Sequence, residues 1–117
     1  EEFKDDKKID RFSLLLFDHN SAELDKKNVD IINTIKSFIS PNSKVIITGY
    51  ADITGEKLYN QELTRKRCLE VQKKLDIPDS RTDIIPMGSN ILLYDNDSPQ
   101  GRSYSRTVQI QIETPIH

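Results

Sequence analysis

One stretch of the chain carries an acidic and a basic residue at a spacing suited to ligand binding. Asp52 stands in a turn formed by residues 49–55, GYADITG, just after an apolar run. Asn60, Leu63 and Arg67 follow at intervals of three and four, which places them on one face of a helix. A turn that folds back on this helix would bring Asp52 near Arg67. Such a pair suits a zwitterion, because a carboxylate takes an ammonium group and a guanidinium grips a carboxylate with two hydrogen bonds.

The same spacing has a simpler interpretation. Charged residues are common on amphipathic helices, and Asp52 and Arg67 could form a surface salt bridge worth about 0–1 kcal/mol. The spacing alone leaves both interpretations open.

Two helices are expected to carry or support these residues. In the first, Val29, Ile32, Ile35 and Ile39 recur every three or four residues. Asp25 is a suitable N-cap for this helix, and Pro41 would end it. The second helix is expected from about residue 56 to residue 75, with Pro78 stopping it.

Four strands are expected, over residues 11–17, 44–48, 82–85 and 107–113. The last is the clearest, because Val108, Ile110 and Ile112 alternate with polar residues, as in a strand with one buried face. Residues 88–105 are rich in turn-forming types and are expected to be a long loop. The order β-α-β-α-β-β predicts an α+β sandwich, a mixed four-stranded sheet with helices packed on one face.

The length of 117 residues suits one domain. Residues 1–10, EEFKDDKKID, are charged and lack a periodic pattern, so they are expected to be a linker or a frayed N-terminal segment. The domain is then expected to occupy residues 11–117. The chain begins abruptly, which fits a fragment of a longer protein.

The composition argues against several classes of protein. The net charge is −2, from 17 basic and 19 acidic residues, so the basic excess typical of nucleic-acid binders is missing. No run of about 18 apolar residues could span a membrane. The single cysteine, Cys68, cannot form an intrachain disulfide and is expected to be a small core residue.

No catalytic or metal-binding constellation is evident in the sequence. The two histidines, His19 and His117, are far apart, and no serine or cysteine nucleophile can be matched with a base. The segment from Gly49 to Gly55 has the wrong spacing for a phosphate loop, and no Gly-Lys-Ser/Thr follows it. Residues 95–106 lack the glycine and glutamate of a calcium loop. We therefore expect neither a metal nor a cofactor, and no enzymatic activity.

Four segments in order resemble the OmpA-like family of peptidoglycan-binding domains, which includes peptidoglycan-associated lipoproteins and flagellar-motor stator proteins. Residues 16–24 (LFDHNSAEL) resemble the family's first strand-to-helix turn. Residues 49–55 resemble its turn with a Gly-His/Tyr-Ala/Thr-Asp pattern, and residues 59–68 (YNQELTRKRC) resemble its Asn-x-x-Leu-Ser-x-x-Arg-Ala helix. Residues 100–102 and 105–108 resemble its closing Gly-Arg and Asn-Arg-Arg-Val signature. The set covers roughly residues 12 to 114.

The resemblance implies binding of the peptidoglycan stem peptide, chiefly of its diaminopimelate residue. Asp52 matches the family aspartate that holds the ammonium group, and Arg67 matches the arginine that holds the carboxylate. Asn60 and Leu63 match residues that line the same cleft. The remaining matches are Phe17 and Asp18 in the first turn, which closes the cleft partly through backbone groups, and Arg106 in the closing signature.

The chain departs from the family pattern at four positions. Thr64 replaces a serine and Cys68 an alanine, and both are small. Ser105 replaces an asparagine and Thr107 replaces the second arginine of the closing signature. The departures at Ser105 and Thr107 put the C-terminal part of the cleft in question.

The resemblance therefore predicts a non-catalytic anchor between an envelope protein and the cell wall. It implies a periplasmic location, with the parent protein attached to the outer membrane through a part outside this sequence. The alternative is a scaffold domain that keeps the fold and binds a protein partner in the periplasm. The sequence leaves open whether the parent is a barrel, a lipoprotein or a stator.

Overall fold

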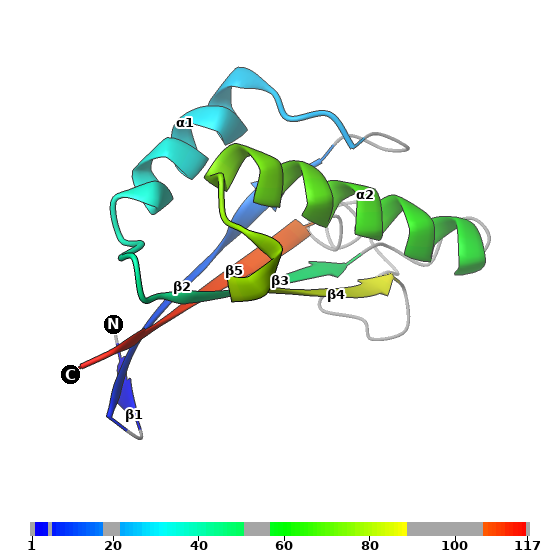
Figure 1. Ribbon diagram of the computed structural model, residues 1–117. Coiled ribbons are helices and arrows are strands. Elements are labelled where there is room, and N and C mark those ends of the chain that lie inside the picture. Colours follow the sequence, from blue (N-terminus) through cyan, green and yellow to red (C-terminus); the bar gives the residue numbers. More distant parts are fainter. Residues whose placement is uncertain (1, 5, 18–21, 51–56, 89–106, 117) are drawn as a thin grey trace.

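The computed structural model describes residues 2–4, 6–17, 22–50, 57–88 and 107–116 (Figure 1). In these described residues, five strands and two α-helices follow one another, with a short 3-10 helix, η1, before β4. They are β1 (Glu2–Lys4), β2 (Lys7–Leu16), α1 (Lys26–Lys36), β3 (Lys44–Tyr50), α2 (Lys57–Leu75), η1 (Asp79–Arg81), β4 (Thr82–Gly88) and β5 (Thr107–Pro115).

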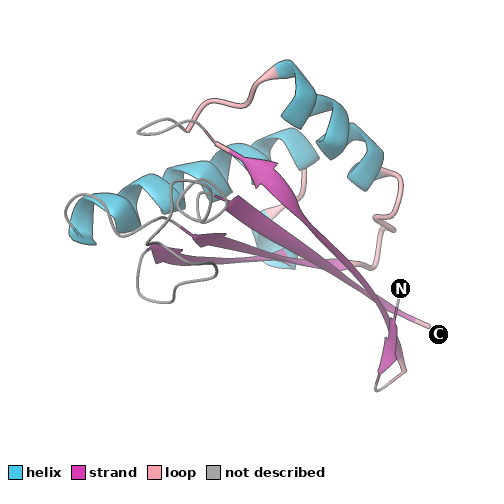
Figure 2. Cartoon of the chain, turned by 180° about the vertical axis from the view of Figure 1, so that it is seen from behind, coloured by secondary structure: helices cyan, strands magenta, loops and turns pink. Residues whose placement is uncertain are grey.

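The strands form one mixed sheet in the order β1-β2-β5-β3-β4. Strand β5 lies in the middle and runs antiparallel to both β2 and β3, whereas β3 and β4 are parallel. Both helices lie on the same side of the sheet (Figures 1 and 2). The predicted α+β class and the one-sided helix layer are confirmed.

The expected number of strands is wrong by one, and the reason is non-local pairing. The sequence predicts a linker over residues 1–10, but Glu2–Lys4 and Lys7–Asp10 are in strands. Lys7 to Asp10 pair with Pro115 to Ile112 on β5, and β1 adds to them as a hairpin. A central strand a hundred residues away in sequence supplies these backbone partners, which the local charge pattern does not reveal.

The alternation predicted for β5 is confirmed. Val108, Ile110 and Ile112 are at most 1 % exposed, whereas Gln109 and Gln111 are half-buried. Val45 and Ile47 of β3 pair beside Ile112 and Ile110 and are equally buried. Strands β5 and β3 therefore present a continuous apolar surface on the helix-covered face of the sheet.

Helix α1 begins where the sequence predicts. The carboxylate of Asp25 accepts a hydrogen bond from the backbone N–H of Asn28 at 2.8 Å, which is an N-cap. Ile32 and Ile35 are buried in the core. The helix ends at Lys36, earlier than Pro41 suggests, because the N–H groups of residues 37–39 bond to carbonyls three residues back in tighter turns.

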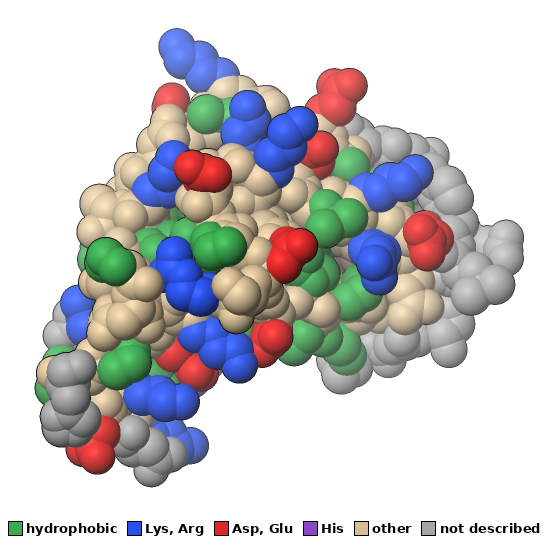
Figure 3. Space-filling model, in the orientation of Figure 1, with side chains coloured by type: hydrophobic (Ala, Val, Ile, Leu, Met, Phe, Trp, Pro, Cys, Tyr) green, Lys and Arg blue, Asp and Glu red, His purple; other side chains and the backbone are tan. Residues whose placement is uncertain are grey.

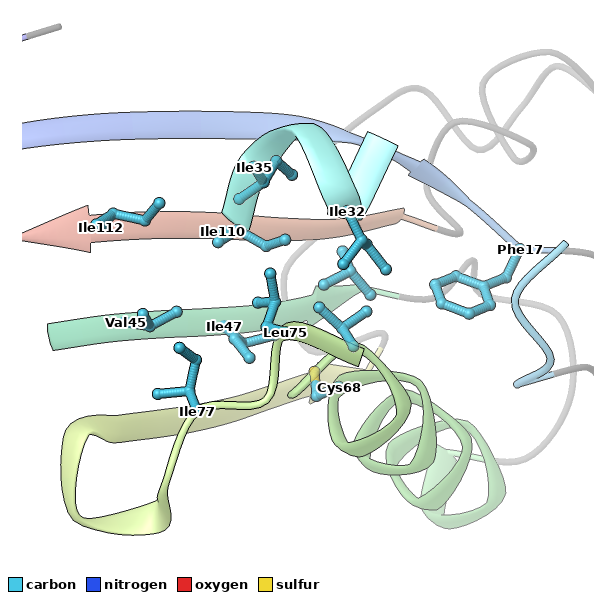
Figure 4. Close-up of a cluster of buried hydrophobic side chains, with 12 residues drawn as sticks. Phe17, Ile32, Ile35, Val45, Ile47, Cys68, Leu75, Ile77, Ile110 and Ile112 are labelled. Carbon is cyan, nitrogen blue, oxygen red and sulfur yellow. The ribbon is translucent and has the colours of Figure 1, made fainter. Parts of the chain in front are cut away.

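Helix α2 packs on β3 and β4 and closes the core (Figure 4). Its inward face carries Leu63, Cys68, Val71 and Leu75, together with three buried polar residues, Thr64, Arg67 and Gln72. The amide of Gln72 donates to the Ile77 carbonyl at 3.2 Å and to an Asp79 carboxylate oxygen at 2.6 Å. These bonds satisfy Gln72 and hold the turn that leads into β4.

The outer surface shows no single-sign field on the face seen in Figure 1. Figure 3 shows basic and acidic side chains interspersed over this face, in keeping with the net charge of −2. Neither helix of the described chain combines the length and the apolar character that crossing a membrane requires.

Loss of the α1 N-cap is expected to destabilise the domain. Asp25→Ala should lower the free energy of unfolding by about 1 kcal/mol, because the N–H of Asn28 loses its acceptor. Asp25→Ser should retain most of the stability. Asp30→Ala, at an exposed position on the same helix, is the matched control. Urea denaturation measures all three, and an equal loss in Asp25→Ala and Asp30→Ala would contradict the capping role.

Candidate functional site

Arg67 is the most deeply buried charged residue of the described chain. It lies near the middle of α2, and only 1 % of its surface is exposed. Its Cζ atom lies 5.1 Å from the ring centroid of Phe17, a distance typical of a cation–π contact. The guanidinium is therefore held inside the domain, and it does not lie on a solvated helix face.

Phe17 provides the aromatic ring of this contact. It is the first residue after β2, and 3 % of its surface is exposed. Figure 4 shows its ring at the end of β2, turned toward the cluster of core side chains. The contact thus joins the end of β2 to the helix that covers β3 and β4.

Gly49 explains how α2 comes close enough to β3. A Cβ atom at this position would lie 2.8 Å from the Cys68 Sγ and 3.1 Å from the Thr64 carbonyl oxygen. Only a residue without a side chain permits this approach of backbone to helix. Since Arg67 is adjacent to Cys68, the same approach sets the depth of the guanidinium.

The helical face predicted from spacing is confirmed where the structure describes it. Leu63, one turn before Arg67, is buried at 9 % exposure. Arg65 and Lys66, which lie between them in sequence, are exposed. Asn60 belongs to α2, but its side chain lies outside the described part of the structure.

The other predicted binding residues, Asp18, Asp52 and Arg106, lie outside the described residues. Their proximity to Arg67 therefore stays a prediction. Of the two departures in the closing signature, Ser105 also lies outside them, and Thr107 begins β5. Thr107 is 4 % exposed, and its hydroxyl has no hydrogen-bond partner among the described residues.

Cys68 is a core residue, as the sequence predicts. It is fully buried, and loss of solvation raises the pKa of its thiol to about 12, with a smaller opposing effect from the Arg67 charge. The thiol therefore stays protonated at neutral pH and is a poor nucleophile.

The site has no sign of a metal centre in its described part. Among residues 2–4, 6–17, 22–50, 57–88 and 107–116, no three histidine, cysteine or acidic side chains converge as metal ligands would. A separate hollow of about 270 Å³ lies on the sheet, away from the candidate site, because Phe17, Leu63 and Arg67 do not line it. Its lining residues are Arg11, Phe12, Ile46, Thr48, Gln109, Ile110 and Gln111.

Two features of the site go beyond what the sequence predicts. The contact between the Arg67 guanidinium and the Phe17 ring joins residues fifty positions apart. The sequence around neither residue predicts it. The role of Gly49 could have been recognised in part from the sequence, because a glycine late in a β-branched strand often marks a close approach of another backbone.

Adding a methyl group at Gly49 is expected to disturb the site. Gly49→Ala should lower the free energy of unfolding by about 1–3 kcal/mol, because the new Cβ overlaps Cys68 and Thr64. Cys68→Ala removes the nearest obstacle, so Gly49→Ala/Cys68→Ala should recover part of this loss relative to Cys68→Ala alone. A double-mutant cycle by denaturation measures the coupling. Strictly additive effects would contradict the proposed contact.

The Cys68 thiol is expected to make stability fall at alkaline pH. The unfolded thiol ionises near its ordinary pKa of 9.0, whereas the native thiol keeps its proton until about pH 12. Raising the pH through this interval therefore favours the unfolded chain. The free energy of unfolding of wild type should decline relative to Cys68→Ala, which shares all other titrating groups. Parallel stability profiles for the two proteins would contradict the burial of the thiol.

Comparison with known proteins places this geometry in a family. Outer membrane porin F of Pseudomonas aeruginosa is 23 % identical over 103 residues, which cover 83 % of this chain and 29 % of porin F. The chain thus spans less than a third of that curated relative.

Two solved structures share the fold. The peptidoglycan-associated lipoprotein from Burkholderia pseudomallei superposes with a TM-score of 0.78 at 18 % identity, covering 86 % of this chain and 88 % of the lipoprotein. The cell wall anchor of the T6SS from Pseudomonas aeruginosa gives a TM-score of 0.77 at 20 % identity, with 91 % and 82 % covered. The model of the OmpA family matches residues 16–106, which run from the end of β2 to the residue before β5, and the chain belongs to that family.

Proposed function

We propose that this domain binds peptidoglycan without covalent chemistry and so holds an envelope protein to the cell wall. Membership of the OmpA family supports this role. The names of two structural relatives, a peptidoglycan-associated lipoprotein and a cell wall anchor, point the same way. The proposal involves no bond made or broken, and it places the domain in the periplasm.

The buried guanidinium of Arg67 is the structural observation on which the site assignment rests. Removing a cation from water costs several kcal/mol. A buried arginine therefore indicates a role that an exposed, solubilising arginine does not have. Arg67 lies 5.1 Å from the Phe17 ring at 1 % exposure, so its long side chain is already ordered before a ligand arrives. An ordered guanidinium loses little entropy on binding a carboxylate through two hydrogen bonds.

The ligand we assign is the stem peptide, through its diaminopimelate residue. Arg67 binds the carboxylate of this residue and Asp52 its ammonium group. Leu63, one turn before Arg67 on the same buried side of α2, supplies an apolar wall. In this proposal the side chain of Asn60 and the first turn, Phe17 with Asp18, complete the cleft, and Arg106 contributes from the closing segment.

Attachment to the outer membrane comes from the rest of the parent protein in this proposal. The domain itself supplies the wall-binding end. A different outcome, a scaffold that binds a periplasmic protein, is favoured by one observation: Thr107 stands buried where the family signature has an arginine. Wall binding distinguishes the two roles directly.

Removal of either charge is expected to weaken wall binding. Arg67→Ala and Asp52→Ala should each reduce the binding free energy by about 3 kcal/mol if the ligand buries the pair. This loss corresponds to a roughly hundredfold higher Kd. Arg65→Ala, at an exposed position two residues from Arg67, is the matched control and should bind like wild type. Co-sedimentation with purified peptidoglycan measures retention, and thermal melting confirms that each variant folds.

Three results would contradict the proposal at different levels. Wild-type retention of Arg67→Ala and Asp52→Ala would show the site assignment wrong. A folded wild-type domain that does not sediment with the wall would favour the scaffold role. New products from muropeptides incubated with the domain would show that it is an enzyme.

A further inference from the structure

The two ends of the sheet have different roles, and the register of β2 with β5 defines them. Lys7 pairs with Pro115 at one end, and Leu16 pairs with Thr107 at the other. The N–H of Ile116 donates to the Asp6 carbonyl at 3.0 Å, which extends the first end by one more bond. Figure 1 shows both chain termini at this end. The Phe17–Arg67 contact lies at the opposite end, because Phe17 directly follows Leu16.

Strand β2 connects the two ends, and its pairing with β5 has one register shift, between Ser13 and Leu15. Strand β2 has ten residues, which corresponds to about 33 Å at the usual rise of an antiparallel strand. It leads straight into Phe17, whose ring is buried in the core and contacts the Arg67 guanidinium. A ligand held at Arg67 and a tether at either terminus would therefore stretch the domain along its strands.

The hydrogen bonds of the sheet lie across this direction. Nine residue pairs join β2 to β5, and six join β5 to β3 on its other side. Bonds in an antiparallel pair run perpendicular to the strands, so a pull along the strands strains the whole ladder at once. A pull that separates two neighbouring strand ends breaks the ladder one pair at a time.

Side chains add further links between the same two strands. The Arg11 Nε donates to the Gln111 Oε1 at 3.2 Å, and the Lys7 ammonium lies 3.6 Å from a Glu113 carboxylate oxygen. Gln111 in turn donates to Glu113 at 2.9 Å. Exposed links of this kind are individually weak. They nevertheless act between β2 and β5, where sliding of the strands would occur.

We infer that the domain is a directional tension element, in which β2 and β5 resist sliding when the termini and the Arg67 site are pulled apart. The physiological meaning rests on the proposed function, since tension arises only if the site holds the wall and a terminus leads to an anchor. The mechanical property belongs to the fold itself. It holds for a tether at either terminus, because β2 begins and β5 ends at the same end of the sheet.

The short strand β1 does not contribute to this resistance. Only three residue pairs join it to β2, in a hairpin at the outer edge of the sheet. A pull on the N-terminus peels these pairs in sequence before β2 is strained. Any measurement from the N-terminus therefore includes the same early release, whichever second attachment point is used.

Single-molecule force spectroscopy in two pulling directions tests the inference. The same variant, Arg65→Cys/Cys68→Ala with terminal tags, serves both directions, and thermal melting verifies its fold. Pulling between the N-terminus and position 65 on α2 should need at least about twice the force of pulling between the two termini, at equal loading rate. Lys66→Cys, at the next exposed position, provides an independent attachment point.

Equal forces in the two directions, or a lower force through α2, would overturn the inference. Detachment of α2 from the sheet before β2 slides from β5 would give that lower force. No peptidoglycan is present in either measurement, so the comparison of forces stands apart from wall binding. A domain that fails to bind the wall can still show the directional resistance, and the reverse result is equally distinguishable.

Discussion

The burial of Arg67 in the helix–sheet interface is the constraint on which the rest of this structure depends. A guanidinium at 1 % exposure must be surrounded by groups that compensate for lost water. The Phe17 ring at 5.1 Å provides one side of that environment, and it requires β2 to end where it does. Gly49 provides room on the other side, because no Cβ separates β3 from Thr64 and Cys68 on α2.

These contacts tie the core to the proposed site. Cys68, Val71 and Leu75 lie on the same inward face of α2 as Arg67, against Val45 and Ile47 of β3. The helix therefore cannot shift to release Arg67 without disturbing the apolar cluster. Packing holds a binding group of this kind in a precise position. An apolar side chain in place of Arg67 would make the helix–sheet interface more stable, so the buried charge lowers stability.

The sequence predicted the elements whose signals are local. The alternation in β5 and the capped periodicity of α1 follow from nearest neighbours, and both agree with the structure. Residues 1–10 were expected to be a linker because their charges hide the start of β2, where Asp10 pairs with Ile112 about a hundred residues away. The prediction of a helix from about residue 56 to residue 75 is confirmed by α2, although Thr64, Arg67 and Gln72 occupy its buried face.

In the candidate site, too, only the local features could be predicted from the sequence. Spacing placed Leu63 and Arg67 on one face, but it could not distinguish a surface salt bridge from a buried guanidinium. The depth of Arg67 depends on Phe17, just after β2, and on Gly49 of β3, so only the tertiary structure reveals it. The resemblance to the OmpA family supplied the ligand class, which neither spacing nor packing specifies.

We propose above all that Arg67 binds the carboxylate of a diaminopimelate residue. A crystal structure of the domain with diaminopimelate bound tests it most directly. We expect a ligand carboxylate within hydrogen-bond distance of the Arg67 guanidinium, with the ligand ammonium group on Asp52. A ligand bound away from Arg67, with the guanidinium still enclosed against Phe17, would contradict it.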